Sequence, residues 1–198
     1  MFVQVIHAAD ADPDVLDVMT RWQQELRPGA IGFLGSTGGR TPSGDLIVVA
    51  RFASEEEARR NSERPEQGDW WSQVSKHLHG EVRFHDCTDV ATMLEGGSDE
   101  AGFVQVITAR ADEGVTAKEV AERASRFVSA HRPDVLGGLC AVAPDGTMFE
   151  VVYFTSEQEA REHEAAELPE DAAAEMEEFW SRFGEPRYFD LPQPVIWS

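Results

Sequence analysis

The feature that most constrains this chain is an internal repeat. Four short segments recur in the same order and at a nearly constant spacing along its 198 residues. They are FVQVI at 2–6 and 103–107, RPGAIG and RPDVLG at 27–32 and 132–137, FASEEEAR and FTSEQEAR at 52–59 and 154–161, and GEVRF and GEPRY at 80–84 and 184–188. Such self-similarity decides the architecture, so we expect two copies of one fold unit.

The segment between the two copies has the composition of a linker. EGGSDEA at 95–101 combines glycine, serine and acidic residues, which are typical of flexible connections. We therefore expect a first repeat at 1–94, a linker at 95–101 and a second repeat at 102–198.

The sequence of the first copy predicts six secondary-structure elements. A β-rich run at 2–8 is followed by Asp12 and Pro13, which form an N-cap and first-turn pair. Apolar residues then recur at helical spacing up to Leu26. Strands are expected at 31–37 and 46–52, around a glycine-rich loop. The capping box Ser54-x-x-Glu57 predicts the start of a second helix, and 81–87 predicts a last strand.

The second copy repeats this order. Its capping boxes are Thr116-x-x-Glu119 and Ser156-x-x-Glu159, and its hairpin turn is the run 144–146, Pro-Asp-Gly. The order β-α-β-β-α-β is that of the ferredoxin-like unit, an antiparallel sheet with helices on one face. Two such units can bury their open sheet faces against each other. We therefore expect an α+β fold, with the two units packed sheet to sheet as an intramolecular pseudo-dimeric α+β barrel, and a monomeric chain.

Charge and composition exclude several classes of partner. The formal net charge is −20, so phosphate backbones and acidic membrane surfaces are disfavoured, and we expect neither nucleic acid nor membrane as partner. No stretch has the roughly 18 apolar residues of a membrane helix, and the amino terminus lacks the pattern of a signal peptide, so a cytoplasmic protein is expected. Cys87 and Cys140 lack the spacing of a zinc site or a disulfide scaffold.

The repeated strand starts FVQVI, the helix openings FASEEEAR and FTSEQEAR, and the aromatic end of the first of those helices carry a family resemblance. Over nearly its whole length the chain resembles two fused copies of the antibiotic biosynthesis monooxygenase-like family, within the dimeric α+β barrel superfamily. The resemblance implies a pocket between helices and sheet. It also implies one of several activities, among them cofactor-independent oxidation of phenolic or quinol substrates and haem degradation.

The resemblance implies a pocket lined by a polar residue on the first strand, Asn and Trp on the second helix, and His or Arg nearby. In the first copy these types are found at eight positions. The expected catalytic residues are His7, Arg83 and His79, and the expected substrate-binding residues are Trp22, Asn61, Trp70, Trp71 and His85. His7 or His79 would act as base and Arg83 would stabilise an anion.

Each of these residues also has a structural interpretation. The tryptophan pair can pack a helix end, and because consecutive helical residues diverge by about 100°, at most one faces the sheet. His7 can be a hydrogen-bonded residue at a strand end, and Arg83 can belong to an ion pair. Gln4 and Gln105 recur in the middle of both first strands. They are expected on the face opposite to His7, as a structural pair near the barrel interior.

The leading functional hypothesis is a cofactor-independent monooxygenase that acts on an aromatic or quinol-type small molecule. A deprotonated, electron-rich ring can reduce O₂ directly, so no cofactor and no metal are expected. Two alternatives remain open: a non-catalytic barrel that binds a small ligand or responds to stress, and a haem-handling protein. The second copy lacks the tryptophan pair and has fewer histidines, so the first copy is the favoured location of the site.

Overall fold

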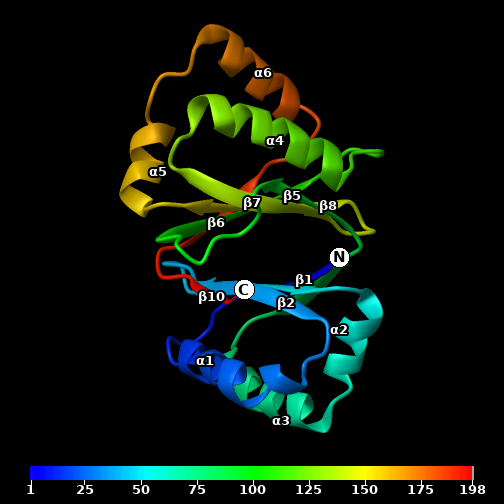
Figure 1. Ribbon diagram of the computed structural model, residues 1–198. Helices are drawn as coiled ribbons and strands as arrows, with labels where there is room; N and C mark the ends of the chain where they lie inside the picture. Colours follow the sequence, from blue (N-terminus) through cyan, green and yellow to red (C-terminus); the bar gives the residue numbers. More distant parts are fainter. Residues whose placement is uncertain (198) are drawn as a thin grey trace. The chain divides into compact units, whose positions relative to one another are not determined.

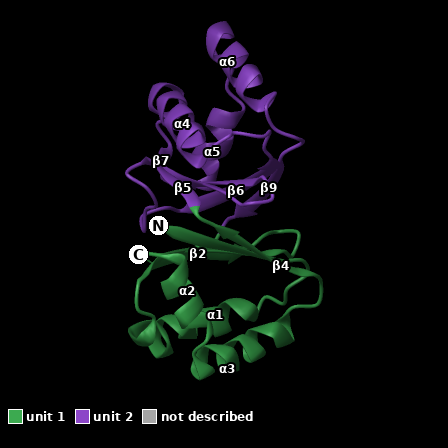
Figure 2. Ribbon diagram, turned by 90° about the vertical axis from the view of Figure 1, so that its right-hand side faces the viewer, with its two compact units in different colours: residues 1–88, 193–198 green, residues 89–192 purple. Residues whose placement is uncertain are grey.

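The computed structural model describes residues 1–197. It divides into two compact units, one formed by residues 1–88 together with the segment from Gln193 onward, the other by Asp89–Pro192 (Figure 2). No helix among the described residues is long and apolar enough to cross a membrane.

The first unit follows the expected order, with one more α-helix than expected. Its elements are β1 (Phe2–Ala8), α1 (Val15–Glu25), β2 (Phe33–Arg40), β3 (Leu46–Phe52), α2 (Glu55–Ser62), α3 (Pro65–Val74) and β4 (Val82–Cys87), with short 3-10 turns at Arg27–Gly29 and Ser75–His77. A further strand, β10 (Val195–Trp197), comes from the carboxyl-terminal segment.

The second unit repeats this order (Figure 1). Its elements are β5 (Asp89–Leu94), β6 (Phe103–Arg110), α4 (Ala117–His131), β7 (Val135–Val142), β8 (Thr147–Phe154), α5 (Glu157–Glu164), α6 (Glu170–Trp180) and β9 (Arg187–Leu191). The repeated ferredoxin-like fold expected from the sequence is therefore confirmed.

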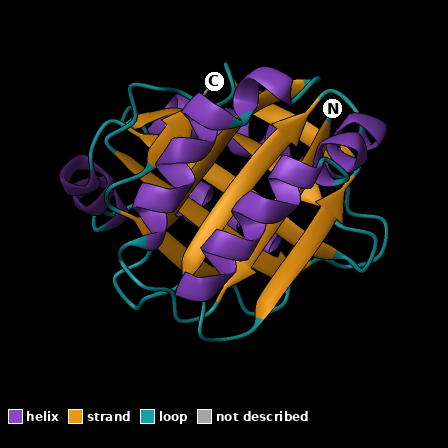
Figure 3. Cartoon of the chain, turned by 90° about the horizontal axis from the view of Figure 1, so that it is seen from below, coloured by secondary structure: helices purple, strands orange, loops and turns teal. Residues whose placement is uncertain are grey.

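Each unit contains one antiparallel five-stranded sheet. The strand orders are β10-β2-β3-β1-β4 and β5-β7-β8-β6-β9, so the four central strands follow the same topology in both. The helices α1 to α3 cover one face of the first sheet, and α4 to α6 cover one face of the second (Figure 1). In Figure 3 helices run along the strands they cover.

The fifth strand of each sheet comes from outside the four-stranded core. Residues 89–94 were expected at the end of the first repeat, but they form β5 and pair with β7, with Ala91 opposite Cys140. The carboxyl-terminal strand β10 pairs with β2 in the equivalent place, with Ile196 opposite Thr37. Both added strands cover an otherwise open sheet edge, whose unpaired N–H and C=O groups favour such pairing. The compact units therefore end at different residues from the sequence repeats.

The helix starts follow the sequence signals in three of four cases. The side chains of Ser54, Thr116 and Ser156 each accept a hydrogen bond from the backbone N–H three residues on, as the capping boxes predicted. The first helix differs, because Asp14 occupies the N-cap of α1 without a side-chain hydrogen bond and residues 12–14 form a turn.

The segment expected as one second helix is divided at a proline in both units. Pro65 starts α3, and Pro169 occupies the N-cap of α6. Proline lacks the backbone N–H that would continue the preceding helix, yet it suits the first turn of a new one. After the break, residues of α3 and α6 line the cavities between helices and sheet in their units.

Candidate functional site

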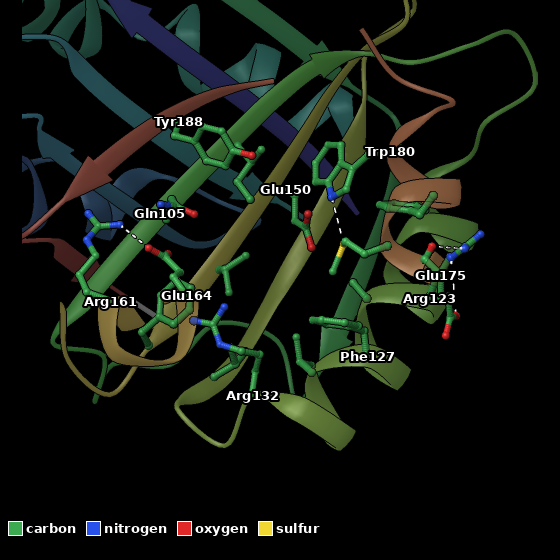
Figure 4. A pocket seen from close by; sticks show the side chains of 18 of the residues that line it. Gln105, Arg123, Phe127, Arg132, Glu150, Arg161, Glu164, Glu175, Trp180 and Tyr188 are labelled. Carbon is green, nitrogen blue, oxygen red and sulfur yellow. Dashed lines mark hydrogen bonds and ion pairs between the residues drawn. The ribbon is translucent and has the colours of Figure 1, made fainter. Parts of the chain in front are cut away.

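The larger of the two cavities that we describe lies in the second unit, between the sheet and helices α4, α5 and α6. Its volume is about 480 Å³. Strands β6, β8 and β9 form its floor, and aromatic side chains from the helices form much of its wall (Figure 4). A volume of this size suits a small organic ligand of a few fused rings.

Glu150 projects from β8 into this cavity, and its side chain is buried. Its carboxylate makes no hydrogen bond or ion pair with any described residue from 1 to 197. Burial raises the pKa of the Glu150 carboxyl to about 7, because the low-dielectric surroundings disfavour the charged form. A buried carboxyl that faces a cavity and titrates near neutrality is well suited to accept or donate a proton.

Glu150 belongs to a row of side chains that crosses the sheet. It lies opposite Cys140 on β7 and opposite Ile107 on β6, and Ile107 in turn lies opposite Tyr188 on β9. Residues directly opposite in an antiparallel sheet share a face, so all four side chains point towards the helices. Burial, with the charge of Glu150 as a second cause, holds the pKa of the Cys140 thiol well above its usual range, so this thiol stays protonated.

Tyr188 stands at the exposed end of this row. About half of its side-chain surface is accessible, although the residue also lines the cavity. Burial of the remainder, followed by the charges of Glu150 and Glu164, raises the pKa of the Tyr188 phenol. The phenol is therefore neutral at physiological pH and can donate a hydrogen bond.

The next row holds a polar pair that is present in both units. Gln105 Nε2 donates to Asp190 Oδ1 at 2.8 Å, and Gln4 Nε2 donates to Asp86 Oδ1 at the same distance. The sequence placed both glutamines near a barrel interior, and this was wrong. Gln105 lines the cavity of the second unit, and Gln4 lines a smaller cavity on the helix-covered face of the first. A pair kept in both units indicates a scaffold role for these residues.

Three arginines line the cavity, and each is held by carboxylates. Arg161 pairs with Asp190 and with Glu164, the latter at 3.0 Å. Arg132 makes a bidentate pair with the buried Asp134, at 2.7 and 3.0 Å. The guanidinium of Arg123 donates to the backbone carbonyl of Glu175 at 2.7 Å and lies within ion-pair distance of the Glu175 and Glu178 carboxylates.

The apolar wall is aromatic. Phe127, Phe154, Phe179 and Trp180 all line the cavity. Trp180 Nε1 points at the sulfur of Met176 at 3.1 Å, and its ring packs edge-on against Phe179 at 5.4 Å. These contacts fix the ring in the wall of the cavity, where it can stack on a flat ligand.

The first unit has a cavity in the equivalent place, but only about 80 Å³ of it is open. Three of the substrate-binding residues expected from the sequence line it: Trp22, Asn61 and Trp70. Trp22 lies 4.8 Å from Phe33 and 6.4 Å from Trp70, measured between ring centroids. Trp197, from β10, also lines this space.

The polar atoms of these residues are already bonded within the protein. Trp22 Nε1 donates to Gln67 Oε1 at 2.8 Å, and Trp70 Nε1 donates to the Val18 carbonyl at 3.1 Å. Asn61 Oδ1 accepts from Arg64 at 2.9 Å. Bonded aromatic side chains from α1 and α3 therefore fill the cavity of the first unit and leave little room for a ligand.

The other expected site residues lie elsewhere, and none of them lines either of these two cavities. His7 and Arg83 are directly opposite each other on β1 and β4, on the sheet face away from the helices. His7 Nε2 is 3.6 Å from Asp45, and Arg83 donates to Glu81 at 2.6 Å. His85 lies opposite Val5, on the same face as His7.

His79 and Trp71 also have structural partners. His79 lies 3.0 Å from Asp12, whose hydrogen bond and charge raise the pKa of the His79 imidazole. The Trp71 ring packs against Phe84 at 5.4 Å and against Trp70 at 6.2 Å. The structure thus separates the eight residues into three in a filled aromatic cavity, three on the opposite sheet face and two in peripheral contacts.

Sequence reasoning missed Glu150 and Tyr188, although one signal was present. Glu150 is the only charged residue in TMFEVVYF, an otherwise apolar or neutral strand of eight residues. Burial of an unpaired carboxyl costs free energy, so a lone glutamate in a buried strand is a signal of function. Among residues 1–197 no group of three or more potential metal ligands comes together.

The sequence matches no family model and no curated protein. The structure, however, is similar to several solved structures. A "putative monooxygenase" from Lactobacillus acidophilus matches with a TM-score of 0.69 and 12% identity, over 100% of this chain and 99% of the other. A "Putative monooxygenase" from Fusobacterium nucleatum matches with a TM-score of 0.72 and 9% identity, over 96% and 90%.

An "anthrone oxidase-like protein" matches with a TM-score of 0.71 and 11% identity, over 98% of this chain and 92% of the other. At these identities the similarity is one of fold. The chain therefore has the tandem ferredoxin-like fold of monooxygenase-like proteins, as the sequence resemblance implied.

Proposed function

We propose that this chain is a monooxygenase-like enzyme which oxidises an aromatic, anthrone- or quinol-type small molecule with O₂ and without a cofactor. The single observation that carries the proposal is Glu150, a buried carboxyl with a pKa of about 7 that faces an aromatic-walled cavity of about 480 Å³. The fold of the solved relatives, one of which is called anthrone oxidase-like, supports the same reaction class.

The proposed chemistry begins with proton transfer to Glu150. A base that titrates near the working pH is close to optimal for abstracting a weakly acidic proton. Removal of a proton from the CH₂ group of an anthrone, or from the hydroxyl of a quinol, leaves an electron-rich anion. The aromatic wall of the cavity excludes water and stacks on the flat ring system.

The oxygen step balances without a further reductant. The substrate anion gives one electron to O₂, and the resulting radical pair combines to form a C–O bond and a peroxide anion, which takes back the proton from Glu150. For an anthrone, the peroxide then loses water, so that CH₂ and O₂ become C=O and H₂O. The substrate supplies all the electrons, and for this reason no cofactor is included in the proposal.

The direct test is oxygen uptake by the purified chain with anthrone, with the quinone product identified by mass spectrometry. Glu150→Gln keeps the size of the side chain but cannot accept a proton, so turnover should fall by about 10²-fold or more. Glu167→Gln, at an exposed position, is the matched control and should retain wild-type turnover. Extensive dialysis against a chelator should leave the activity unchanged.

Two other outcomes would replace the proposal. Tight binding of anthrone or anthraquinone without oxygen uptake would favour a non-catalytic ligand-binding protein. A Soret band that appears when haem is titrated into the protein, again without turnover of anthrone, would favour a haem-handling role.

A further inference from the structure

The cavity of the second unit differs from its counterpart at three positions of one row. In the first unit the row that corresponds to Cys140, Glu150, Ile107 and Tyr188 contains Gly38, Val48, Ile6 and Phe84. The central isoleucine is kept, while both of its flanking polar groups are present only in the second unit. The Gln–Asp pair of the next row is common to both.

This contrast separates scaffold from site. Gln105 and Asp190 recur as Gln4 and Asp86, so they belong to the fold. Glu150 and Tyr188 flank the same isoleucine and occur only beside the large cavity. They place two polar groups on either side of its floor. Since neighbouring strands are about 5 Å apart, the Cα atoms of Glu150 and Tyr188 are about 10 Å apart, with apolar Ile107 between them.

The two groups have complementary chemistry. Figure 4 shows both side chains at the floor of the cavity, with the hydroxyl end of Tyr188 turned towards the side on which Glu150 projects. One is a proton acceptor, and the other is a neutral phenol that can donate a hydrogen bond. A substrate that lies over Ile107 can therefore lose a proton to Glu150 at one edge of a ring while its oxygen accepts a hydrogen bond from Tyr188 at the other.

We infer that Tyr188 binds the substrate oxygen on which negative charge develops, and that the substrate carries this oxygen across one six-membered ring from the proton that Glu150 removes. This deepens the proposed function and rests on it. The arrangement selects anthrones, in which the acidic CH₂ group and the carbonyl oxygen lie on opposite sides of a ring. It disfavours quinols, in which the oxygen that loses the proton is also the oxygen that takes the charge. The proton passes to Glu150, and the charge moves through the ring to the oxygen held by Tyr188.

Binding of 4-nitrophenol tests this inference without any oxygen chemistry. Its absorbance reports ionisation directly, so the pKa of the bound phenol can be read by titration. Tyr188→Phe removes one donor to the phenolate oxygen, so the bound pKa should rise and phenolate affinity should fall by about 10-fold, as expected for a hydrogen bond to a charged group. Phe84→Tyr, at the matched position of the first unit, should change neither value.

Two further measurements separate a binding role from a structural one. The chain has two tyrosines, and Tyr153 is buried, so nitration by tetranitromethane should modify Tyr188 first, and bound 4-nitrophenol should protect it. In turnover, Tyr188→Phe should lower kcat for anthrone by about 10-fold or more while the Tm stays within a degree or two of wild type.

The outcomes distinguish this inference from the proposed function. If Tyr188→Phe binds and ionises 4-nitrophenol as the wild type does, the assignment of Tyr188 is overturned even when anthrone turns over. If quinols are oxidised faster than anthrones, the substrate class is wrong. If Tyr188→Phe shifts the phenol pKa but the wild type consumes no oxygen, the oxyanion site stands and the monooxygenase proposal falls.

Discussion

At the scale of single residues, the two units use the same positions for different purposes. Val48 and Glu150 occupy matched places in the third strand of their sheets, opposite Ile6 and Ile107. Valine completes a packed cavity, whereas glutamate places a titratable group beside an open one. The difference between valine and glutamate at this one position thus turns a packing residue into a titratable group. It also has a measurable consequence for the free energy of unfolding.

The stability of the chain should depend on pH through Glu150. Its pKa is raised to about 7 in the folded protein, compared with about 4.5 in an unfolded chain. The unfolded state therefore releases this proton first as the pH rises. The contribution of the protonated Glu150 carboxyl to the free energy of unfolding is fully present below about pH 4.5. It is lost between that value and about pH 7. At about 1.4 kcal/mol per pKa unit, the loss is about 3 kcal/mol.

Urea unfolding of the wild type and of Glu150→Gln checks this expectation. Glutamine cannot ionise, so the variant should gain about 3 kcal/mol relative to the wild type between about pH 4.5 and about pH 8. Other carboxylates titrate in both proteins and cancel in the difference. Glu167→Gln, at an exposed site, should show no such trend. A difference that stays constant with pH would contradict the burial of an unpaired carboxyl.

The residues expected from the sequence give a second, discriminating prediction. His7 and Arg83 lie side by side on the sheet face away from the cavity of their own unit, and Arg83 is exposed and paired with Glu81. Their replacement by alanine should leave anthrone turnover within about twofold of wild type, since neither side chain lines a cavity and the exposed Arg83–Glu81 pair contributes about 1 kcal/mol or less to stability. Oxygen uptake by both variants measures this. Loss of turnover in both would restore the first repeat as the site.

At the scale of elements, the helices decide which cavity remains open. In the first unit, Trp22 of α1 and Trp70 of α3 fill the space above the sheet. In the second unit, α4 presents the small residues Ala124 and Val128 beside Phe127, and about 480 Å³ stays open. The same strand floor therefore supports a packed core in one unit and a ligand-sized cavity in the other.

Alanine substitution of one tryptophan in each unit should separate the two roles. Trp22→Ala should cost about 3 to 5 kcal/mol of unfolding free energy, because it empties a buried position and leaves Gln67 without its donor. Trp180→Ala, at the edge of an existing cavity, should cost less stability but weaken anthrone binding by about 10-fold. Urea unfolding and fluorescence titration measure both effects. The reverse pattern would place the ligand in the first unit.

The sequence predicted the order of elements because its signals are local. Capping boxes at Ser54, Thr116 and Ser156 and the repeated strand starts depend on residues a few positions apart, and all of these elements are present. The fifth strands β5 and β10 could not be read this way. They are defined by pairing with β7 and β2, which lie far along the chain, rather than by their own pattern.

The candidate site was harder to predict for a related reason. Counting histidines and tryptophans by copy favoured the first repeat, because residue type is visible in a sequence and empty volume is not. Trp22, Asn61 and Trp70 do come together, but they fill their cavity. The register that brings Glu150, Ile107 and Tyr188 into one row involves three strands and emerges only in the folded sheet.

At the scale of the whole molecule, the dominant property is charge. A formal net charge of −20 on 198 residues creates a negative field that repels anions approaching from solution. The positive charges of the three arginines that line the cavity are already neutralised, since each arginine is paired with carboxylates. The molecule should therefore discriminate among substrates of the same shape by their charge, before any contact inside the cavity is made.

This discrimination predicts a specific dependence on salt. For a neutral anthrone, kcat/KM should change little between about 10 mM and about 300 mM NaCl. For an anthrone that carries a carboxylate substituent, kcat/KM should start lower and rise severalfold over the same range, because the screening length falls from about 30 Å to below about 8 Å. Oxygen uptake at each salt concentration gives both curves, and equilibrium dialysis of the matching quinones provides a measurement that does not depend on turnover. A carboxylated substrate that loses activity as salt is added would instead mean that a cavity guanidinium attracts it locally despite its carboxylate partner. Arg132 and Arg161, the two arginines held by Asp134 and Asp190, would then be the residues to replace first.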